Sequence, residues 1–372
     1  MIYADNAATT ELDIDAFEAM RPFLLQQYGN PSQAYSFGIG VRKAIKNARE
    51  TIARCIGANP EEIYFTSCGT ESDNWAIKKG SCTGKGIITS VIEHHAILNS
   101  CSAMKRNGVS VTYLPVNDIG EVLPEVLERN IGSDSGIVSV MFANNEIGTL
   151  QKIRELTDIT HRHEALFHTD AVQAVGHIDI NVHELNVDML SASAHKFNGP
   201  KGIGFLYIKN GIEIPSYMDG GGQEFGMRAG TENVASIVAM AVALQKNCAN
   251  IEANKKHLEE LERLLIHRLD ESGIDYRRNG GPNHIPGNIS LSFKGKEGEM
   301  ILHRMDLKGI CISTGSACDS VNTEESHVIK AIGVPNEYAL GTIRISLGKN
   351  NTYEEVNYIS DALISIMKSR IY

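Results

Sequence analysis

The chain has 372 residues, of which 42% are hydrophobic and 22% charged, and its formal net charge is −10. This composition is ordinary for a folded globular protein and excludes extensive disorder. The negative charge argues against direct DNA binding and against an anionic lipid surface as partner. A chain of this length is too long to fold around one ordinary hydrophobic core, so we predict two domains.

Targeting and metal signals are weak. The first residues contain neither a basic leader nor an apolar signal core, and no apolar run reaches the length of a membrane span. The seven cysteines are scattered and form no Cys-x-x-Cys pair, which argues against a disulfide framework and a cysteine zinc site. His161, His163 and His168 lie close in sequence but lack a matching cluster of cysteines or carboxylates. The sequence thus predicts a cytoplasmic protein without a membrane span or a bound metal.

Helices and strands alternate through the first two thirds of the chain. A small polar arm at 5–10 precedes predicted helices over 13–27 and 41–56. The later helices are predicted around Trp75, at 99–106 and at 153–164. The predicted strands are 62–66, 86–90, 109–113, 136–142, 165–170, 187–190 and 204–208. This alternation predicts an α/β fold with a mainly parallel, doubly wound sheet.

The last third of the chain has a different pattern. A glycine-rich loop at 219–231 opens a long helical stretch, 232–269, with a polar interlude near 247–254 that can break it. The C-terminal elements are strands at 288–293, 309–313 and 342–346, a helix at 297–305, and a last helix that begins with a capping box of Thr352 and Glu355. We therefore predict a large domain over 13–250 and a smaller α+β domain formed by 1–12 and 251–372.

Polar residues recur where the predicted strands end, namely Thr70, His94, Asn145, Asp170 and Lys196. In a doubly wound sheet, ligands bind beyond the carboxyl ends of the strands, so these side chains are expected to share one site. A solvated loop is the ordinary setting for a lysine. At such a site, however, desolvation can remove its charge, and a neutral amine can attack a carbonyl to form a Schiff base.

Two further segments carry chemistry. The turn at 67–74 joins a strand to a helix, which suits a phosphate, although Ser67 or Thr70 could simply cap the helix. Cys318 lies among small polar residues, a composition typical of a loop, and a loop thiol suggests a chemical role. Cys311 lies between two isoleucines and is expected in the core.

Taken together, these motifs resemble the NifS/IscS-type cysteine desulfurases, which are class V aminotransferase-like enzymes of pyridoxal phosphate (PLP) fold type I. The resemblance covers essentially the whole chain. Its motifs occur in the family's order: 3–10, 29–32, 66–74, Glu93-His94, 144–148, Asp170 to Gln173, His195-Lys196, 220–231, 315–318 and Ile343-Arg344.

The resemblance implies a role for each candidate site residue. Lys196 would bind the PLP aldehyde as a Schiff base, Asp170 would pair with the ring nitrogen, and Gln173 would hydrogen-bond the ring hydroxyl. His94 would stack on the ring and relay protons. The residues that would hold the phosphate are Gly69, Thr70, Ser193, His195 and, reaching in from a second subunit, Thr231. The residues that would bind the substrate carboxylate are Asn145, which also contacts the cofactor, and Arg344.

The implied reaction converts L-cysteine to L-alanine. Lys196 would remove the Cα proton, and the Cys318 thiolate would take the sulfur as a persulfide. A homodimer is implied, and an acceptor or scaffold protein would receive the sulfur for iron–sulfur cluster assembly or tRNA thiolation. Three features depart from the family pattern: Phe225 stands where an arginine is common, Cys68 replaces a small residue, and 319–327 is atypical.

Two alternatives remain open at this point. One is a selenocysteine lyase or another class V PLP lyase or aminotransferase, because the PLP residues do not separate these activities. The other is a catalytically silent scaffold for sulfur-carrier or cluster-assembly proteins.

Overall fold

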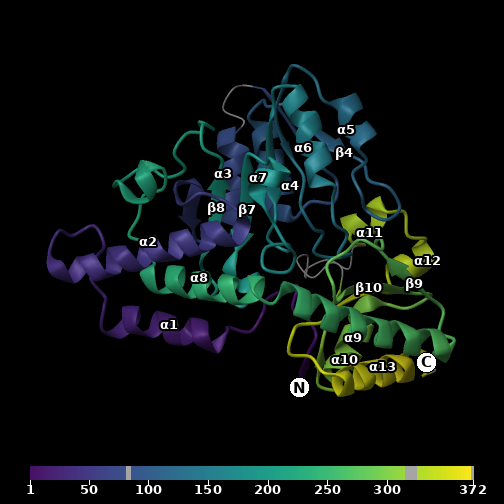
Figure 1. Ribbon diagram of the computed structural model, residues 1–372. Coiled ribbons are helices and arrows are strands. Elements are labelled where there is room, and N and C mark those ends of the chain that lie inside the picture. Colours follow the sequence, from purple (N-terminus) through teal and green to yellow (C-terminus); the bar gives the residue numbers. More distant parts are fainter. Residues whose placement is uncertain (81–84, 315–324, 370–372) are drawn as a thin grey trace.

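A seven-stranded sheet lies at the centre of the larger part of the protein (Figure 1). The computed structural model describes residues 1–80, 85–314 and 325–369. In sheet order the strands are β2 (Ile63–Thr66), β8 (Gly204–Ile208), β7 (Met189–Ser193), β6 (Leu166–Asp170), β5 (Ser135–Ser139), β3 (Gly86–Ser90) and β4 (Val111–Leu114). Strand β8 is antiparallel to β2 and β7, and the other pairs are parallel. The predicted α/β class with a mainly parallel sheet is confirmed.

Helices cover both faces of this sheet because successive strand residues point to opposite sides. On one face lie α3 (Gly69–Gly80) and α4 (His95–Arg106). The other face is covered by α2 (Ser36–Ile56), α5 (Pro124–Asn130), α6 (Ile153–Arg162), α7 (Val182–Leu185) and α8 (Val234–Cys248). Helix α1 (Ile14–Leu25) packs on α8. Ile87 and Met189 face the first group, whereas the adjacent Ile88 and Leu190 face the second.

The C-terminal part forms a second core. Its antiparallel sheet has the order β12 (Ser313–Thr314), β13 (Thr342–Ser346), β10 (Asn288–Phe293) and β9 (Tyr276–Asn279). The helices of this part are α9 (Ile251–Ser272), α10 (Gly298–Asp306), α11 (His327–Ala331), α12 (Asn336–Ala339) and α13 (Tyr353–Lys368). Residues from α9, α10 and α13 pack together with β10 and β13 around a buried apolar cluster. The predicted capping box at Thr352 and Glu355 begins α13.

Several predicted elements have different limits in the structure. The strand predicted at 309–313 is two strands, because β11 (Ile310–Cys311) pairs with β1 (Ile2–Tyr3) and β12 pairs with β13. Helix α4 begins at His95 rather than at 99, because the His94 side chain caps it. The helical stretch predicted at 232–269 does break, and α8 and α9 meet at an angle of 68°.

No single helix in the described ranges is both long enough and apolar enough to cross a membrane. The bent pair α8 and α9 meets that test only when the two helices are taken together, on length and composition alone. Most of α8 is buried against the larger sheet, as expected of a core helix.

The N-terminal arm connects the two cores. Its backbone donates hydrogen bonds first to the smaller part, from Ala4 N to Cys311 O (2.9 Å) and from Asn6 N to Ser346 O (3.1 Å). A few residues later, Thr10 N donates to His195 O over 2.9 Å, in the turn that carries Lys196. The predicted domain limits, 13–250 and 1–12 with 251–372, stay a prediction, but the arm contacts both parts.

The smaller core should depend strongly on Leu265, which lies in α9 and is 0% exposed. We expect Leu265→Ala to lower the free energy of unfolding by about 2–5 kcal/mol, because it removes buried methyl groups and leaves a cavity. Chemical denaturation would measure this loss. Leu307→Ala, at a leucine that is 86% exposed, should change it by less than about 0.5 kcal/mol. Equal effects of the two substitutions would contradict the assigned core.

Candidate active site

A cavity of about 300 Å³ lies where β3, β5, β6 and β7 end. It collects the side chains predicted at the strand ends and most of the other candidate residues. Those that line it are Gly69, Thr70, His94, Asn145, Asp170, Gln173, Ser193, His195, Lys196 and Arg344. Thr231 is exposed and lines a different cavity, and Cys318 lies outside the described residues.

The amine of Lys196 is held by the N-terminal arm. Lys196 follows β7 in a single 3₁₀ turn, Ala194–Lys196. Its Nζ donates to the carbonyl oxygens of Ala7 (2.6 Å) and Ala8 (2.9 Å). On the backbone side, the Nε2 of His177 lies 2.8 Å from the Lys196 carbonyl oxygen. The arm therefore fixes the position of this amine, a function that the sequence did not indicate for these alanines.

Asp170 ends β6 and is only 5% exposed. Its Oδ1 accepts a hydrogen bond from Val172 N at 2.9 Å. Burial raises the pKa of this carboxyl, while His94 and Lys196 act in the opposite direction. A carboxylate in such a place is stabilised by a cationic group brought into the cavity.

His94 and Gln173 face the same cavity and have defined orientations. His94 Nδ1 accepts a hydrogen bond from Ala96 N at 3.1 Å, which caps α4. Burial lowers the pKa of His94, so its ring is neutral with the proton on Nε2. Gln173 Nε2 donates to the Ala7 carbonyl oxygen at 2.9 Å, so its side chain braces the arm that also holds Lys196.

The turn before α3 can receive an anion. Gly69 and Thr70 begin α3, a helix of 12 residues whose first N–H groups lack intrahelical partners. A Cβ at Gly69 would lie 2.6 Å from Cγ2 of Val172, so only glycine permits this approach. Across the cavity, His195 Nδ1 lies 3.1 Å from Oγ1 of Thr9, and burial lowers its pKa to about 4. Its ring is therefore neutral at physiological pH.

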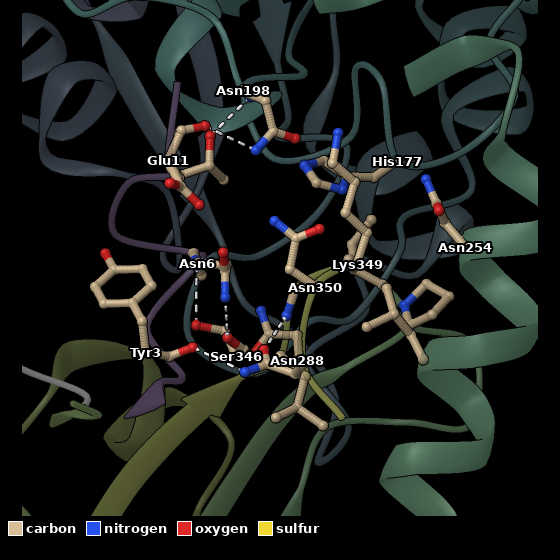
Figure 2. A pocket seen from close by; sticks show the side chains of 18 of the residues that line it. Tyr3, Asn6, Glu11, His177, Asn198, Asn254, Asn288, Ser346, Lys349 and Asn350 are labelled. Carbon is tan, nitrogen blue, oxygen red and sulfur yellow. Dashed lines mark hydrogen bonds between the residues drawn. The ribbon is translucent and has the colours of Figure 1, made fainter. Parts of the chain in front are cut away.

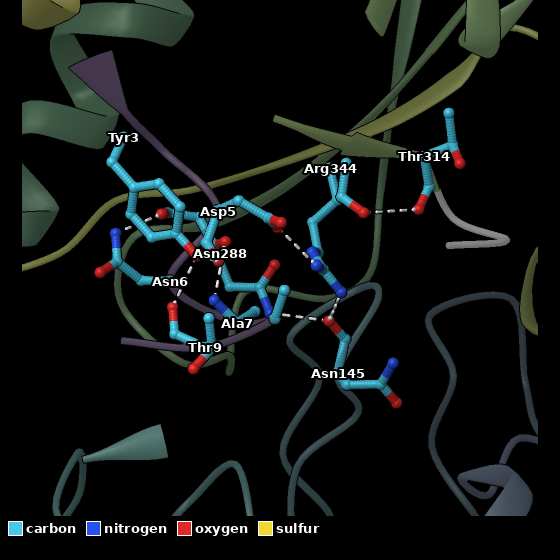
Figure 3. A network of polar contacts seen from close by, with 12 residues as sticks. Tyr3, Asp5, Asn6, Ala7, Thr9, Asn145, Asn288, Thr314 and Arg344 are labelled. Carbon is cyan, nitrogen blue, oxygen red and sulfur yellow. Dashed lines mark hydrogen bonds and ion pairs between the residues drawn. The ribbon is translucent and has the colours of Figure 1, made fainter. Parts of the chain in front are cut away.

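Arg344 of β13 brings the smaller part of the protein to this cavity (Figure 3). Its Nη2 lies 2.7 Å from Oδ1 of Asp5, and its Nη1 donates to the Asn145 carbonyl oxygen at 3.0 Å. The side chain is nearly buried, and its Nε has no hydrogen-bond partner among the described residues. Asp5 and Asn145 thus orient a guanidinium that still offers a donor to a carboxylate.

A buried polar layer, which the sequence alone did not reveal, lies behind the cavity. His168 stands two residues before Asp170 on β6, so both side chains lie on the same face. Its ring nitrogens lie 2.9 Å from the hydroxyls of Ser139 and Ser191, and Nε2 lies 3.8 Å from Oδ1 of Asp73. The run of three polar residues that ends β6, His168 to Asp170, is the available sequence signal for this layer.

The histidines considered for a metal have other partners. His161 Nε2 lies 2.8 Å from Asp188, and His163 Nε2 lies 3.0 Å from Glu128. Within the described ranges, no group of three or more His, Cys, Asp or Glu side chains has an arrangement suited to a metal ion.

A second cavity, of about 480 Å³, lies on the other side of the arm (Figure 2). Ala7 and Gln173 line both cavities and so form part of the wall between them. Many of the lining residues labelled in Figure 2 are asparagines, including Asn6, Asn198 and Asn350. Lys196, Asp170 and Arg344 line the smaller cavity and not this larger one. We therefore take the smaller cavity as the candidate site.

The His168 layer predicts a pH dependence of stability. Burial lowers the pKa of His168 to about 3, from 6.5 in the unfolded chain. Between these values the unfolded state binds more protons, so stability should fall as the pH is lowered from about 6.5 toward 3. One such group contributes a slope of at most about 1.4 kcal/mol per pH unit. Denaturation of wild type and His168→Gln across this range should give a shallower slope for the variant, and parallel slopes would contradict the assignment.

Comparisons with known proteins agree with this geometry. The chain matches the aminotransferase class-V family over residues 2–359. It is 48% identical over 372 residues to the cysteine desulfurase IscS of Dictyoglomus turgidum, covering 99% of this chain and 94% of that protein. It is 45% identical over 371 residues to the cysteine desulfurase IscS of Methanosarcina thermophila, covering 99% and 92%.

Solved structures show the same likeness. A NifS-like protein superposes with a TM-score of 0.93 at 39% identity, covering 98% of each chain. The structure of SspA in complex with cysteine superposes with a TM-score of 0.83 at 34% identity, covering 95% of this chain and 100% of that one. Sequence motifs, site geometry and full-length similarity converge on one assignment. The chain belongs to the class-V aminotransferase family, among its IscS/NifS-like cysteine desulfurases.

Proposed function

We propose that this desulfurase uses PLP in the Lys196 cavity to take sulfur from L-cysteine, and that Cys318 carries the sulfur to an acceptor protein in the cytoplasm. The observation that carries the proposal is the convergence of Lys196, Asp170 and Arg344 on one cavity at the carboxyl edge of the sheet. An amine, a buried carboxyl and a guanidinium are the groups needed to hold an aldehyde cofactor and an amino acid substrate.

The class-V aminotransferase family is PLP-dependent, and the lining of the cavity fits that cofactor. When bound, PLP supplies an aldehyde that condenses with amines and a ring that withdraws electrons. Lys196 would hold the aldehyde carbon, Asp170 the ring nitrogen and Gln173 the ring hydroxyl. The start of α3 at Gly69 and Thr70, with Ser193 and His195, would hold the phosphate.

The substrate carboxylate is assigned to Arg344 and Asn145. Asp5 holds Nη2 of Arg344 at 2.7 Å, while the buried Nε lacks a protein partner among the described residues. A guanidinium oriented in this way binds a carboxylate with little loss of side-chain entropy. The cysteine found with SspA, which is 34% identical to this chain, supports an amino acid of this size.

Lys196 is also the base that we assign to the Cα proton. Its amine already lies against two carbonyl oxygens of the arm, which stabilise it in the charged form after it accepts a proton. His94, neutral and with its proton on Nε2, is the second group that can pass a proton within the cavity.

The place of Cys318 in the chain supports its role. Its segment leaves β12 at Thr314, which pairs with Ile343, the residue before Arg344. The chain is described again from residue 325, and Ser326 and His327 line the cavity. Both ends of the segment therefore lie beside the site where sulfur would be released. Acceptor proteins of iron–sulfur cluster assembly or tRNA thiolation remain the expected recipients.

We also propose a homodimer. Large apolar side chains are exposed along α1, the loop after it and the start of α2, and we call them the α1–α2 patch: Ile14, Phe17, Leu24, Leu25, Tyr28, Tyr35, Phe37 and Ile39. Such a concentration of exposed apolar groups is typical of an interface. Thr231 does not line the cavity of its own chain, so a phosphate contact by this residue requires a second subunit.

Two substitutions separate cofactor binding from sulfur transfer. Cys318→Ala should keep the absorbance of bound PLP and its response to L-cysteine, but lose the protein persulfide and most alanine formation. Lys196→Ala should lose alanine formation and leave no PLP attached to the chain after borohydride reduction. Absorbance spectra, alanine assays and mass spectrometry of the persulfide measure these outcomes. A persulfide that forms normally in Cys318→Ala, or reduced PLP attached elsewhere than Lys196, would contradict the proposal.

The dimer can be tested on the α1–α2 patch. Phe17→Glu and Leu24→Glu place charges at side chains that are 41% and 55% exposed, and should weaken association at least tenfold. Light scattering during size-exclusion chromatography measures the mass, with Leu307→Glu as a matched control at an exposed leucine of the smaller part. A double variant that stays dimeric at low concentration would show that the interface lies elsewhere.

A further inference from the structure

Two cysteines meet where α2 and α8 pack together. Cys55 lies in the last turn of α2, and Cys248 is the last residue of α8. The Sγ of Cys248 lies 3.9 Å from the Cys55 carbonyl oxygen, to which its thiol donates. Both side chains are partly buried against the main core, and α2 and α8 lie side by side (Figure 1). The proposed desulfurase reaction uses neither thiol.

The two thiols are not equivalent. The neighbouring Cys248 side chain lowers the pKa of Cys55, burial opposes this shift, and the nearby Arg54 adds to it. The Cys55 side chain in turn raises the pKa of Cys248, and burial adds to that rise. A thiolate is the reactive form of cysteine. Because the Cys248 thiol donates to the Cys55 carbonyl oxygen over 3.9 Å, we assign Cys248 as the proton-bearing partner and Cys55 as the nucleophile.

The other described cysteines lack this arrangement. Cys101 is 0% exposed, and burial raises the pKa of its thiol to about 12. Cys68 lines the active-site cavity, with its sulfur 3.6 Å from the Ser67 hydroxyl. Cys311 lies on β11, where it pairs with Tyr3. These three thiols serve as internal controls.

We propose that Cys55 and Cys248 form a reversible oxidation site for hydroperoxides, in which Cys55 reacts first and Cys248 closes a disulfide between α2 and α8. In the first step the Cys55 sulfur attacks the peroxide, the O–O bond breaks, and the departing oxygen takes a proton to leave as water or an alcohol. Cys55 is then a sulfenic acid. In the second step the Cys248 sulfur attacks that sulfur, the S–O bond breaks, and the hydroxide leaves as water with the Cys248 proton. The dithiol loses two electrons and the hydroperoxide gains them.

The disulfide would act on the backbone beside Lys196. Asn247, the residue before Cys248, donates from Nδ2 to the Phe197 carbonyl oxygen at 2.6 Å, and Phe197 follows Lys196 directly. The Nζ of Lys349 also lies 3.4 Å from Oδ1 of Asn247. A covalent bond at Cys248 would fix the end of α8 that carries this contact. The position of the site thus connects the oxidation state of the chain to the turn that holds its reactive amine.

Peptide mapping of the intact, cofactor-loaded protein tests the proposal directly. The protein would be treated with hydrogen peroxide, its free thiols alkylated, and the digest analysed without reduction. We expect a linked Cys55–Cys248 peptide, in at least half of the molecules, that disappears after dithiothreitol. The same treatment of Cys55→Ser and Cys248→Ser should give no linked peptide from these positions, whereas Cys101→Ser should behave as wild type.

A second measurement assigns the order of the steps. In Cys248→Ser the sulfenic acid of Cys55 has no partner, so a dimedone adduct should accumulate at Cys55 at least fivefold over wild type. Dimedone labelling at Cys248 of Cys55→Ser should stay low. Over-oxidised Cys55 in wild type without a linked peptide, or oxidation at Cys101 and Cys311 ahead of Cys55, would overturn the proposal. Mapping does not depend on turnover, so failure here is distinct from failure of the proposed sulfur transfer.

Discussion

The geometry of the candidate site depends on one contact, in which the amine of Lys196 lies against the carbonyl oxygens of Ala7 and Ala8. A partly buried ammonium needs such acceptors, and the chain supplies them from its first residues rather than from the turn beside the lysine. The same arm is bonded to the smaller part at Ser346. The position of the amine is therefore set jointly by both cores. A change in the packing of either core would move the arm and, with it, the amine.

Local sequence signals were sufficient to predict the large sheet and the site residues that lie at its carboxyl edge. Each strand is a short apolar run followed by a polar turn, and parallel strands place their carboxyl ends at the same edge. Thr70, His94, Asn145, Asp170 and Lys196 consequently line one cavity, although they are spread over more than a hundred residues of sequence. The break between α8 and α9 was also visible, because polar residues interrupt the apolar pattern there.

Other parts of the site depend on contacts that no local pattern records. Arg344 finds Asp5 and the carbonyl of Asn145 only because β13 meets the arm and the turn after β5. The strand predicted at 309–313 divides for a related reason, since its first half pairs with the N-terminus and its second half with β13. Partners that are distant in sequence are chosen by tertiary packing, which overrides the local propensity for one continuous strand.

The buried acids explain why this cavity suits a positively charged group. Asp73, Glu93 and Asp170 are all buried, and burial raises the pKa of each, to about 8 for Glu93. Asp170 further raises the pKa of the other two, because like charges in a medium of low polarity repel strongly. Glu93 has its own donors, Ser90 Oγ at 2.6 Å and Met141 N, and is satisfied within the protein. Asp170 faces the cavity instead, so a cation that enters there offsets the free-energy cost of burying its charge. The neighbouring acids, Asp73 and Glu93, add to that cost and so make the effect of a cation larger.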